Sequence, residues 1–328
     1  MLLAAIPSPG VNGFNVGPLR IHFYALCIIV GIVLALWITA RRLRARGVNP
    51  EVVYDLGMWC VPFGIIGGRA YHVVSHWPDY FGPGKDLSDV FKIWEGGLAI
   101  MGAITLGAVG AWIGCRRSGL KMSAFADAAA PGLLVAQAMG RWGNWFNQEL
   151  FGGPTTLPWG LRIDPASPNF PAGLPADTLF HPTFLYEMLW NLAGALFIVL
   201  LDRRLRFRHG SAFWLYVMVY SFGRYLVEHI RIDPAVHLTV LGIDDRINSW
   251  AAVLIFLIGL VGFLVTVRRT RRERRDAGRL ASAASHGSHS PEAREEALEE
   301  ERTSLEAGSP FSRFERARSR GIVLDDKV

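Results

Sequence analysis

The charged residues of this chain are distributed very unevenly along its length. Of its 62 charged residues, 26 lie between Arg268 and the C-terminus, a stretch of 61 residues. Residues 1–267 are therefore only about 13% charged, roughly half the share found in an ordinary soluble domain. Such a sparse charge excludes a conventional soluble enzyme and a wholly disordered chain. It predicts a membrane-embedded body, residues 1–267, followed by a polar tail, residues 268–328.

Within the body, seven segments are candidate transmembrane helices. A helix needs about 20 mostly apolar residues to cross the roughly 30 Å hydrocarbon layer. The first and last segments are the most clearly apolar, whereas the second contains Asp55, Arg69 and His72, and the third is rich in glycine. We therefore predict an all-α integral membrane protein with about seven spans, at residues 21–40, 52–76, 97–115, 124–140, 183–201, 211–228 and 248–267.

The basic residues indicate how these spans are oriented. Loops on the cytoplasmic side carry an excess of Lys and Arg. Every basic cluster here follows an odd-numbered segment, which predicts an outer N-terminus and a cytoplasmic C-terminus. The clusters are Arg41, Arg42, Arg44 and Arg46; Arg116, Arg117 and Lys121; Arg203, Arg204, Arg206 and Arg208; and Arg268, Arg269, Arg271, Arg272, Arg274 and Arg275.

The basic clusters, the cysteines and the C-terminal tail exclude some partners and structures. The same clustering at segment ends argues against a nucleic-acid groove, so no nucleic-acid partner is expected. Cys27, Cys60 and Cys115 cannot form a closed disulfide set and show no metal-binding spacing, so we interpret them as packing residues. The tail beyond Arg275 has too few apolar residues to bury a core, which predicts a largely disordered cytoplasmic appendage.

The densest group of polar residues in the body is Gly140–Gly152, which we place at the outer end of the fourth span. Ionisable groups at membrane depth are costly and indicate function. The planar guanidinium of Arg141 suits a phosphate, and Asn144, Asn147 and Glu149 have side chains that can orient it or bind hydroxyl groups. The structural alternative is an aromatic belt at the membrane interface with a simple Glu–Arg pair.

Four further polar sets fall on the same predicted side of the membrane. Arg224 and Glu228 are four residues apart, so that they share a helix face and can pair with each other. One outward-facing polar cavity explains the coincidence better than five separate interfacial groups do. Arginines in a cavity with apolar walls predict a site that handles an anionic lipid at the outer leaflet. The sets are His22 with Tyr24, Glu95–Gly97, His181–Glu187 and Gly223–Arg231.

These residues also resemble a known family. The segment Gly140–Gly152 is similar to the signature G-R-x-G-N-F-x-N-x-E-x-x-G of bacterial prolipoprotein diacylglyceryl transferases, with Trp145 in the place of the phenylalanine. The other four sets resemble further blocks of that family in the same order. The resemblance covers about residues 15–267, and the tail lies outside it.

The resemblance implies that the chain transfers the diacylglyceryl group of phosphatidylglycerol to the lipobox cysteine of a prolipoprotein. A thioether would form, glycerol phosphate would be released, and no metal or organic cofactor is implied. Position by position, it implies catalytic roles for Arg141, Arg224, Tyr24, Glu149 and Asn144. It implies substrate binding by Arg141, Asn144, Asn147, Gly152, Glu228, His22, Asp127 and His181.

The residue that accepts the proton of the cysteine thiol stays open at this point. Many family members carry a histidine shortly after the Glu-Gly-Gly segment, where this chain has Met101, and a methionine cannot accept a proton at neutral pH. Glu149, His22 and Tyr24 are alternatives. A multi-pass lipid transporter or flippase is the rival function, although the internal repeats typical of transporters are not evident in the sequence.

Overall fold

The computed structural model describes residues 5–287, apart from Pro18, Pro83 and Leu241, together with Glu299, Arg302 and Thr303. The described part of the chain is mostly helical and divides into two compact units. The first contains the residues up to Thr39 together with Ala126–Thr270, and the second contains Ala40–Phe125 and the helical residues from Arg271. The predicted body, residues 1–267, is therefore not one compact unit.

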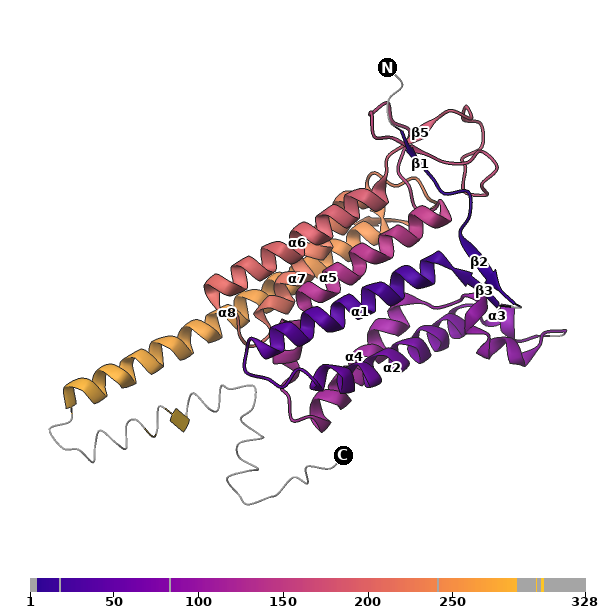
Figure 1. Cartoon of the computed structure of the whole chain (residues 1–328). Helices are drawn as coiled ribbons and strands as arrows, with labels where there is room; N and C mark the ends of the chain where they lie inside the picture. Colours follow the sequence, from indigo (N-terminus) through magenta and orange to yellow (C-terminus); the bar gives the residue numbers. More distant parts are fainter. Residues whose placement is uncertain are drawn as a thin grey trace. The chain divides into compact units, whose positions relative to one another are not determined.

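The first unit is built on long helices that lie side by side, as Figure 1 shows for α1, α5, α6 and α7. A core of buried apolar residues, which includes Leu134, Ile198 and Leu215, joins α5 to α6 and α7. The helix pair α1–α5 packs through glycine, because a Cβ atom on Gly132 would lie 2.9 Å from the backbone oxygen of Ala35. The helices are α1 (Phe23–Arg44), α5 (Met122–Asn147), α6 (Thr183–Leu205), α7 (Ser211–Glu228) and α8 (Ile247–Gly287).

Short strands and loops cover one end of these helices. Strands β1 (Ile6–Pro7), β4 (Leu161–Arg162) and β5 (Leu179–Phe180) form a sheet in the order β1-β4-β5, parallel between β1 and β4 and antiparallel between β4 and β5. This sheet closes over a second buried cluster, Phe151, Leu161, Ile163, Phe180 and Phe184. Two antiparallel hairpins complete the unit: β2 (Gly13–Val16) with β3 (Leu19–His22), and β6 (His237–Val240) with β7 (Ile243–Arg246).

The second unit is centred on a closely packed helix pair, α2 (Val52–Ser75) and α4 (Ile100–Arg117). Buried Arg69 of α2 fixes the connection between them, because its guanidinium donates to the backbone oxygens of Val90, Gly96 and Gly97. That connection contains α3 (Trp77–Tyr80), η1 (Leu87–Phe91) and η2 (Ile93–Glu95).

Each of the seven predicted spans corresponds to one of the helices α1, α2, α4, α5, α6, α7 and α8. Three of them are long and apolar enough to cross a membrane by length and composition: α1, α6 and α8 over Ile247–Arg279. The described structure is therefore that of a helical protein with three candidate membrane spans.

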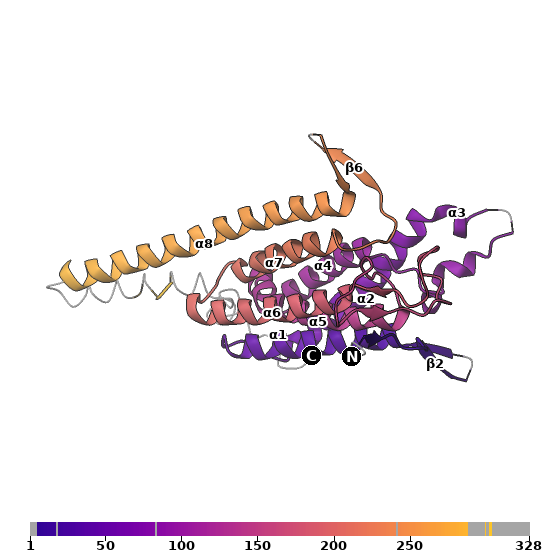
Figure 2. The same ribbon diagram turned by 90° about the horizontal axis from the view of Figure 1, so that it is seen from above.

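Two helices extend well beyond the predicted segments. Helix α5 continues past residue 140 to Asn147, so that most of the Gly140–Gly152 segment is helix rather than turn. Helix α8 is one continuous helix that continues past residue 267 to Gly287 (Figure 2), so the first part of the predicted disordered tail is helical. The remainder of that tail lies outside the described residues, except for Glu299, Arg302 and Thr303.

Candidate active site

Four of the five polar sets belong to the first unit and lie at helix ends that meet. Arg141 and Asn144 are in the last two turns of α5, Glu187 is in the second turn of α6, and Arg224 and Glu228 are in the last turns of α7. Because α6 runs antiparallel to α5 and α7, its start and their ends come together. The antiparallel order thus gathers side chains that are up to 87 residues apart in the sequence.

Arg141 is held between the end of α5 and the start of α6. Its Nε atom lies 3.0 Å from Glu187 Oε2, and its Nη1 atom donates a hydrogen bond of 3.3 Å to Asn144 Oδ1. The Glu187 side chain is only 7% exposed and that of Arg141 17%, so the pair is largely shielded from solvent. The charge of Glu187 also acts on Arg224, although more weakly than that of Glu228, the ion-pair partner of Arg224.

Glu149 is not the ionic partner of Arg141, contrary to the simple Glu–Arg pair that we considered. Its Oε1 atom accepts hydrogen bonds from Asn144 Nδ2, at 2.8 Å, and Asn147 Nδ2, at 3.2 Å. The neighbouring residues Gln148 and Leu150 have φ angles of 51° and 59°, which side-chain-bearing residues rarely adopt. The strained backbone turns the chain immediately after α5 and folds Glu149 back against the two asparagines.

Tyr24 lies against α5 at the same end. A Cβ atom on Gly143 would come within 2.2 Å of Tyr24 Cδ2, so the absence of a side chain at Gly143 lets the phenol ring pack on the helix. Both Glu149 and Arg141 act electrostatically on the Tyr24 hydroxyl group. His22 is half-buried at the end of β3, two residues before Tyr24.

Gly152 and His181 join the loops around the site. Gly152 donates its backbone N–H to the oxygen of His181, and it bridges to Arg231. A Cβ atom on Gly152 would lie 2.8 Å from His181 Cβ and 2.7 Å from a methyl carbon of Ile230. Gly152 therefore allows these loops to approach each other, and the substrate contact that the resemblance implies for it stays a prediction. The His181 ring meets the Tyr186 hydroxyl, with a separation of 3.2 Å.

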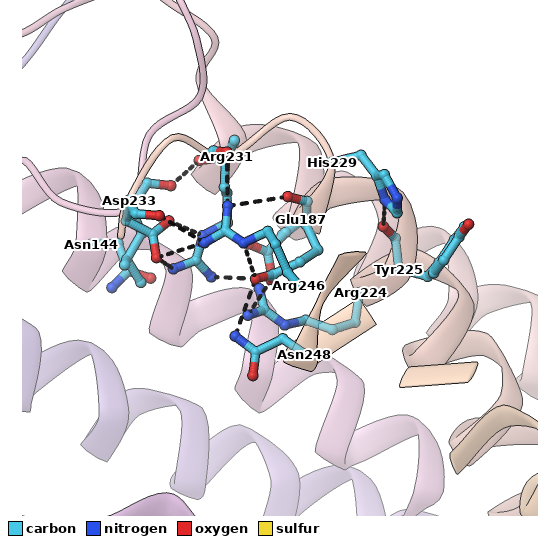
Figure 3. A network of polar contacts seen from close by, with 12 residues as sticks. Asn144, Glu187, Arg224, Tyr225, His229, Arg231, Asp233, Arg246 and Asn248 are labelled. Carbon is cyan, nitrogen blue, oxygen red and sulfur yellow. Dashed lines mark hydrogen bonds and ion pairs between the residues drawn. The ribbon is translucent and has the colours of Figure 1, made fainter. Parts of the chain in front are cut away.

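Glu228 is the centre of a cluster of arginines, shown from close by in Figure 3. Its side chain is 0% exposed. Arg224 Nη2 lies 2.6 Å from Oε2, Arg246 Nε lies 2.9 Å from Oε1, and Arg231 Nη1 lies 3.8 Å from Oε2. The predicted Arg224–Glu228 pair is confirmed. A fully buried carboxylate surrounded by arginines positions those arginines, and the substrate-binding role implied for Glu228 stays a prediction.

Asp233 supports the same cluster from the segment after α7. Arg231 donates to both of its carboxylate oxygens, at 2.7 and 2.8 Å, which is the bidentate geometry of a strong ion pair. Burial alone would raise the pKa of Asp233. The hydrogen bonds and charge of Arg231, together with the charge of Arg246, outweigh that effect and hold this pKa below its usual value.

Asp127 lies apart from this site, and the substrate-binding role that the resemblance implies for it stays a prediction. It lies near the start of α5, whereas Arg141 is 14 residues further along the helix, or about 21 Å at 1.5 Å per residue. Its buried carboxylate accepts backbone N–H bonds from Gly210, Ala212 and Phe213. These N–H groups have no partner within α7, so Asp127 is the capping residue of that helix.

Five residues of the cluster were not among the predicted site residues: Glu187, Arg231, Asp233, Arg246 and Asn248. Glu187 and Arg231 fall inside the polar sets. Glu187 is also an acidic residue in the first turns of an apolar segment, and this position indicates a functional role. Arg246 is detectable as an arginine on the predicted outer side, where the sequence has no basic clusters.

The fifth polar set belongs to the second unit. There Gly97 packs against His72, because a Cβ atom at Gly97 would lie 2.8 Å from His72 Nε2. Met101, in the position where the family often has histidine, is 57% exposed on α4. Among the described residues, no group of three or more His, Cys, Asp or Glu is placed to hold a metal ion.

Comparison with known proteins identifies the family of this chain. The family model of prolipoprotein diacylglyceryl transferase matches residues 12–265, which is most of the chain. The chain belongs to this family. The match ends close to the end of the apolar part of α8, so the last 63 residues lie beyond it.

Individual relatives carry a more specific name. A phosphatidylglycerol–prolipoprotein diacylglyceryl transferase of Paenarthrobacter aurescens is 56% identical over 259 residues, which cover 77% of this chain and 80% of the relative. Transferase 1 of Streptomyces coelicolor is 50% identical over 258 residues, covering 79% of this chain and 73% of that protein. The relative from Cutibacterium acnes is 51% identical over 252 residues, with coverage of 77% and 83%.

Proposed function

We propose that this protein transfers the diacylglyceryl group of phosphatidylglycerol to the lipobox cysteine of a prolipoprotein. Its family membership supports the reaction, and the names of its relatives support both substrates. The observation that carries the chemistry is a pair of arginines at helix ends that meet: Arg141 pairs with buried Glu187, and Arg224 pairs with buried Glu228.

The reaction needs no nucleophile from the enzyme. The cysteine thiol loses its proton, and the thiolate attacks the carbon of the diacylglyceryl group that is bonded to the phosphate oxygen. The carbon–oxygen bond breaks with its electron pair on oxygen, a thioether forms, and glycerol phosphate leaves. During this step the phosphodiester monoanion becomes a monoester that approaches a dianion, so negative charge grows on the leaving group.

Arg141 and Arg224 are the groups suited to this growing charge, because preorganised cations stabilise a transition state where charge develops. The contacts of Arg141 within the described chain engage Nε and Nη1, so the Nη2 edge is available to a phosphate. Nη1 of Arg224 is buried without a hydrogen-bond partner among the described residues. A buried donor without a partner is costly, and a phosphate oxygen would satisfy it.

Asn144, Asn147, Glu149 and Tyr24 form the neighbouring part of the site. In this proposal the two asparagines place Glu149, and Glu149 and Tyr24 face the headgroup and the cysteine. Glu149, His22 and Tyr24 remain the candidates for accepting the thiol proton.

The predicted topology completes the proposal. With seven spans, an outer N-terminus and a cytoplasmic C-terminus in a bacterial cytoplasmic membrane, the site would open to the outer face, where prolipoproteins appear after export. A site near the end of the helices, rather than at their midpoint, suits a phospholipid headgroup.

The test is whether release of glycerol phosphate depends on the peptide. Purified protein in phosphatidylglycerol vesicles should release glycerol phosphate only after a lipobox peptide is added. A transporter or flippase would move lipid between leaflets without releasing it, and that result would overturn the proposal. Release without peptide would instead indicate a phospholipase.

A further inference from the structure

The three arginines around Glu228 do not have equal capacity to bind a substrate. An arginine has five N–H donors in a fixed planar fork. The number of these donors that the protein itself occupies shows which arginine has donors left for a ligand. Figure 3 shows Arg224, Arg231 and Arg246 converging on this region.

All donors of Arg246 are directed at the protein. Nη1 donates to the backbone oxygens of Arg231, at 2.8 Å, and Glu228, at 3.4 Å. Nη2 donates to Asp233, at 2.9 Å to the backbone oxygen and 3.1 Å to Oδ2. Nε forms an ion pair with Glu228 Oε1, although its N–H is not aligned for a hydrogen bond. The side chain is 10% exposed, both Nη atoms donate to the protein, and Nε faces Glu228, so no donor of Arg246 is directed toward a phosphate.

Glu228 is held differently at its two oxygens. Oε1 contacts Arg246 and accepts a hydrogen bond of 3.1 Å from Asn248 Nδ2. Oε2 faces Arg224, at 2.6 Å, and more distantly Arg231. Because the two oxygens belong to one rigid carboxylate, the ion pair of Arg246 and the hydrogen bond of Asn248 at Oε1 together set the direction of Oε2. The direction of Oε2 then fixes the guanidinium of Arg224, whose Nη1 is the donor without a partner.

We propose that Arg246 is a positioning residue, which sets the guanidinium of Arg224 through Glu228. This inference rests on the proposed function, since Arg224 matters there as the cation at the departing phosphate. Arg246 lies at the end of β7, immediately before α8, so the β6–β7 hairpin carries one of the supports of the active site.

The competing explanation is that Arg246 only anchors the hairpin through Asp233. The two roles differ in which second substitution, at Glu228 or at Asp233, should be non-additive with a substitution of Arg246. If Arg246 acts through Glu228, its loss frees the carboxylate and misplaces Arg224, which lowers turnover in protein that is still folded. If Arg246 is only an anchor, its substitution lowers the melting temperature, and this effect is non-additive with that of substituting Asp233.

The experiment measures kcat, KM for phosphatidylglycerol and the melting temperature for Arg246→Gln, Glu228→Gln, Asp233→Asn and the double variants. A misplacement of about 1 Å is enough to slow an enzyme about 100-fold. We therefore expect Arg246→Gln to lower kcat by about 10- to 100-fold, with a smaller change in KM. The loss should be strongly non-additive with Glu228→Gln and nearly additive with Asp233→Asn.

Arg246→Lys keeps the positive charge but lacks the planar guanidinium, and it should retain more activity than Arg246→Gln. If Arg246→Gln does not fold, Arg246→Lys takes its place in the double-variant comparison. Arg162→Gln, at an exposed arginine of β4, is the matched control and should behave as wild type. A folded Arg246 variant with kcat within twofold of wild type, or coupling in kcat to Asp233 rather than Glu228, would overturn the proposal. Failure of the wild-type protein in the same assay would instead contradict the proposed function.

Discussion

At the scale of single residues, the number of donors and acceptors that the protein leaves unoccupied separates side chains that act on a substrate from side chains that position other residues. Arg141 and Arg224 have donors available, whereas Arg246 and Asp127 direct their polar atoms at the protein. Sequence spacing alone does not make this distinction, since both kinds of residue are charged groups in apolar surroundings.

Replacing either available arginine should therefore impair the chemical step. We expect Arg141→Ala and Arg224→Ala each to lower kcat by about 10²–10³-fold, because each removes one preorganised cation from the transition state. Turnover is measured as thioether formation per folded molecule. If both variants keep near wild-type turnover, the assignment of the phosphate to these arginines is wrong.

Asp127 should behave in the opposite way. Asp127→Ala removes the acceptor for backbone N–H groups at the start of α7 and should destabilise the protein by about 1–3 kcal/mol. Thermal unfolding in detergent measures the loss. The protein that stays folded should keep its kcat and its KM for phosphatidylglycerol, and a selective rise in KM would support the substrate-binding role instead.

Asp233 makes the stability of the site depend on pH. Its pKa is lower in the folded protein than in the unfolded chain, so its stabilising effect is complete above the usual aspartate pKa of about 4 and is lost as the pH falls through the folded value. Asp233→Asn should lower the melting temperature at pH 7, and its difference from wild type should shrink below about pH 4. A difference that does not vary with pH would exclude the carboxylate charge as its cause.

At the scale of helices and loops, the sequence predicts best what depends on local composition. The seven apolar segments all form helices, and 211–228 coincides with α7. A long apolar segment in lipid must satisfy its backbone hydrogen bonds internally, and the helix does this. Helix ends were harder to predict. The fourth predicted segment ends at residue 140, yet α5 continues to Asn147, where Tyr24 packs on Gly143 and Arg141 pairs with Glu187 of α6.

The contacts between distant segments were beyond sequence analysis. Arg246 and Glu228 are 18 residues apart with a hairpin between them, and Arg141 and Glu187 are separated by a long loop. The regular spacing of side chains along a helix or a strand predicts contacts within one element, and it does not predict contacts between such distant residues. The sequence therefore predicted several members of the site, such as Arg141 and Asn144, but not the carboxylates and arginines that hold them.

Close packing on α5 gives a prediction at this scale. Gly143→Ala places a methyl group against the ring of Tyr24 and should lower both the melting temperature and activity. Gly140→Ala, one turn earlier, has nothing within 4 Å of the added carbon and should keep the wild-type melting temperature. Equal melting temperatures for the two variants would show that the Tyr24 contact does not limit the packing of α1 on α5.

At the scale of the whole molecule, the uneven charge predicts both a membrane location and an orientation. The two exposed alanines Ala45, just after α1, and Ala166, in the loop before α6, lie on opposite predicted sides. In a variant without native cysteines, a membrane-impermeant maleimide applied to intact cells should label Ala166→Cys but not Ala45→Cys. Labelling in the reverse pattern would invert the proposed topology and place the site on the cytoplasmic face.

The most direct test of the proposed transfer follows the cysteine of the acceptor. Purified protein in phosphatidylglycerol is incubated with a lipobox peptide or with the same peptide carrying serine in place of cysteine, and the products are identified by mass spectrometry. The account predicts one diacylglyceryl group in thioether linkage on the cysteine peptide, an equal amount of glycerol phosphate, and no product from the serine peptide. An unmodified cysteine peptide, or a lipid attached elsewhere than at the sulfur, would contradict it.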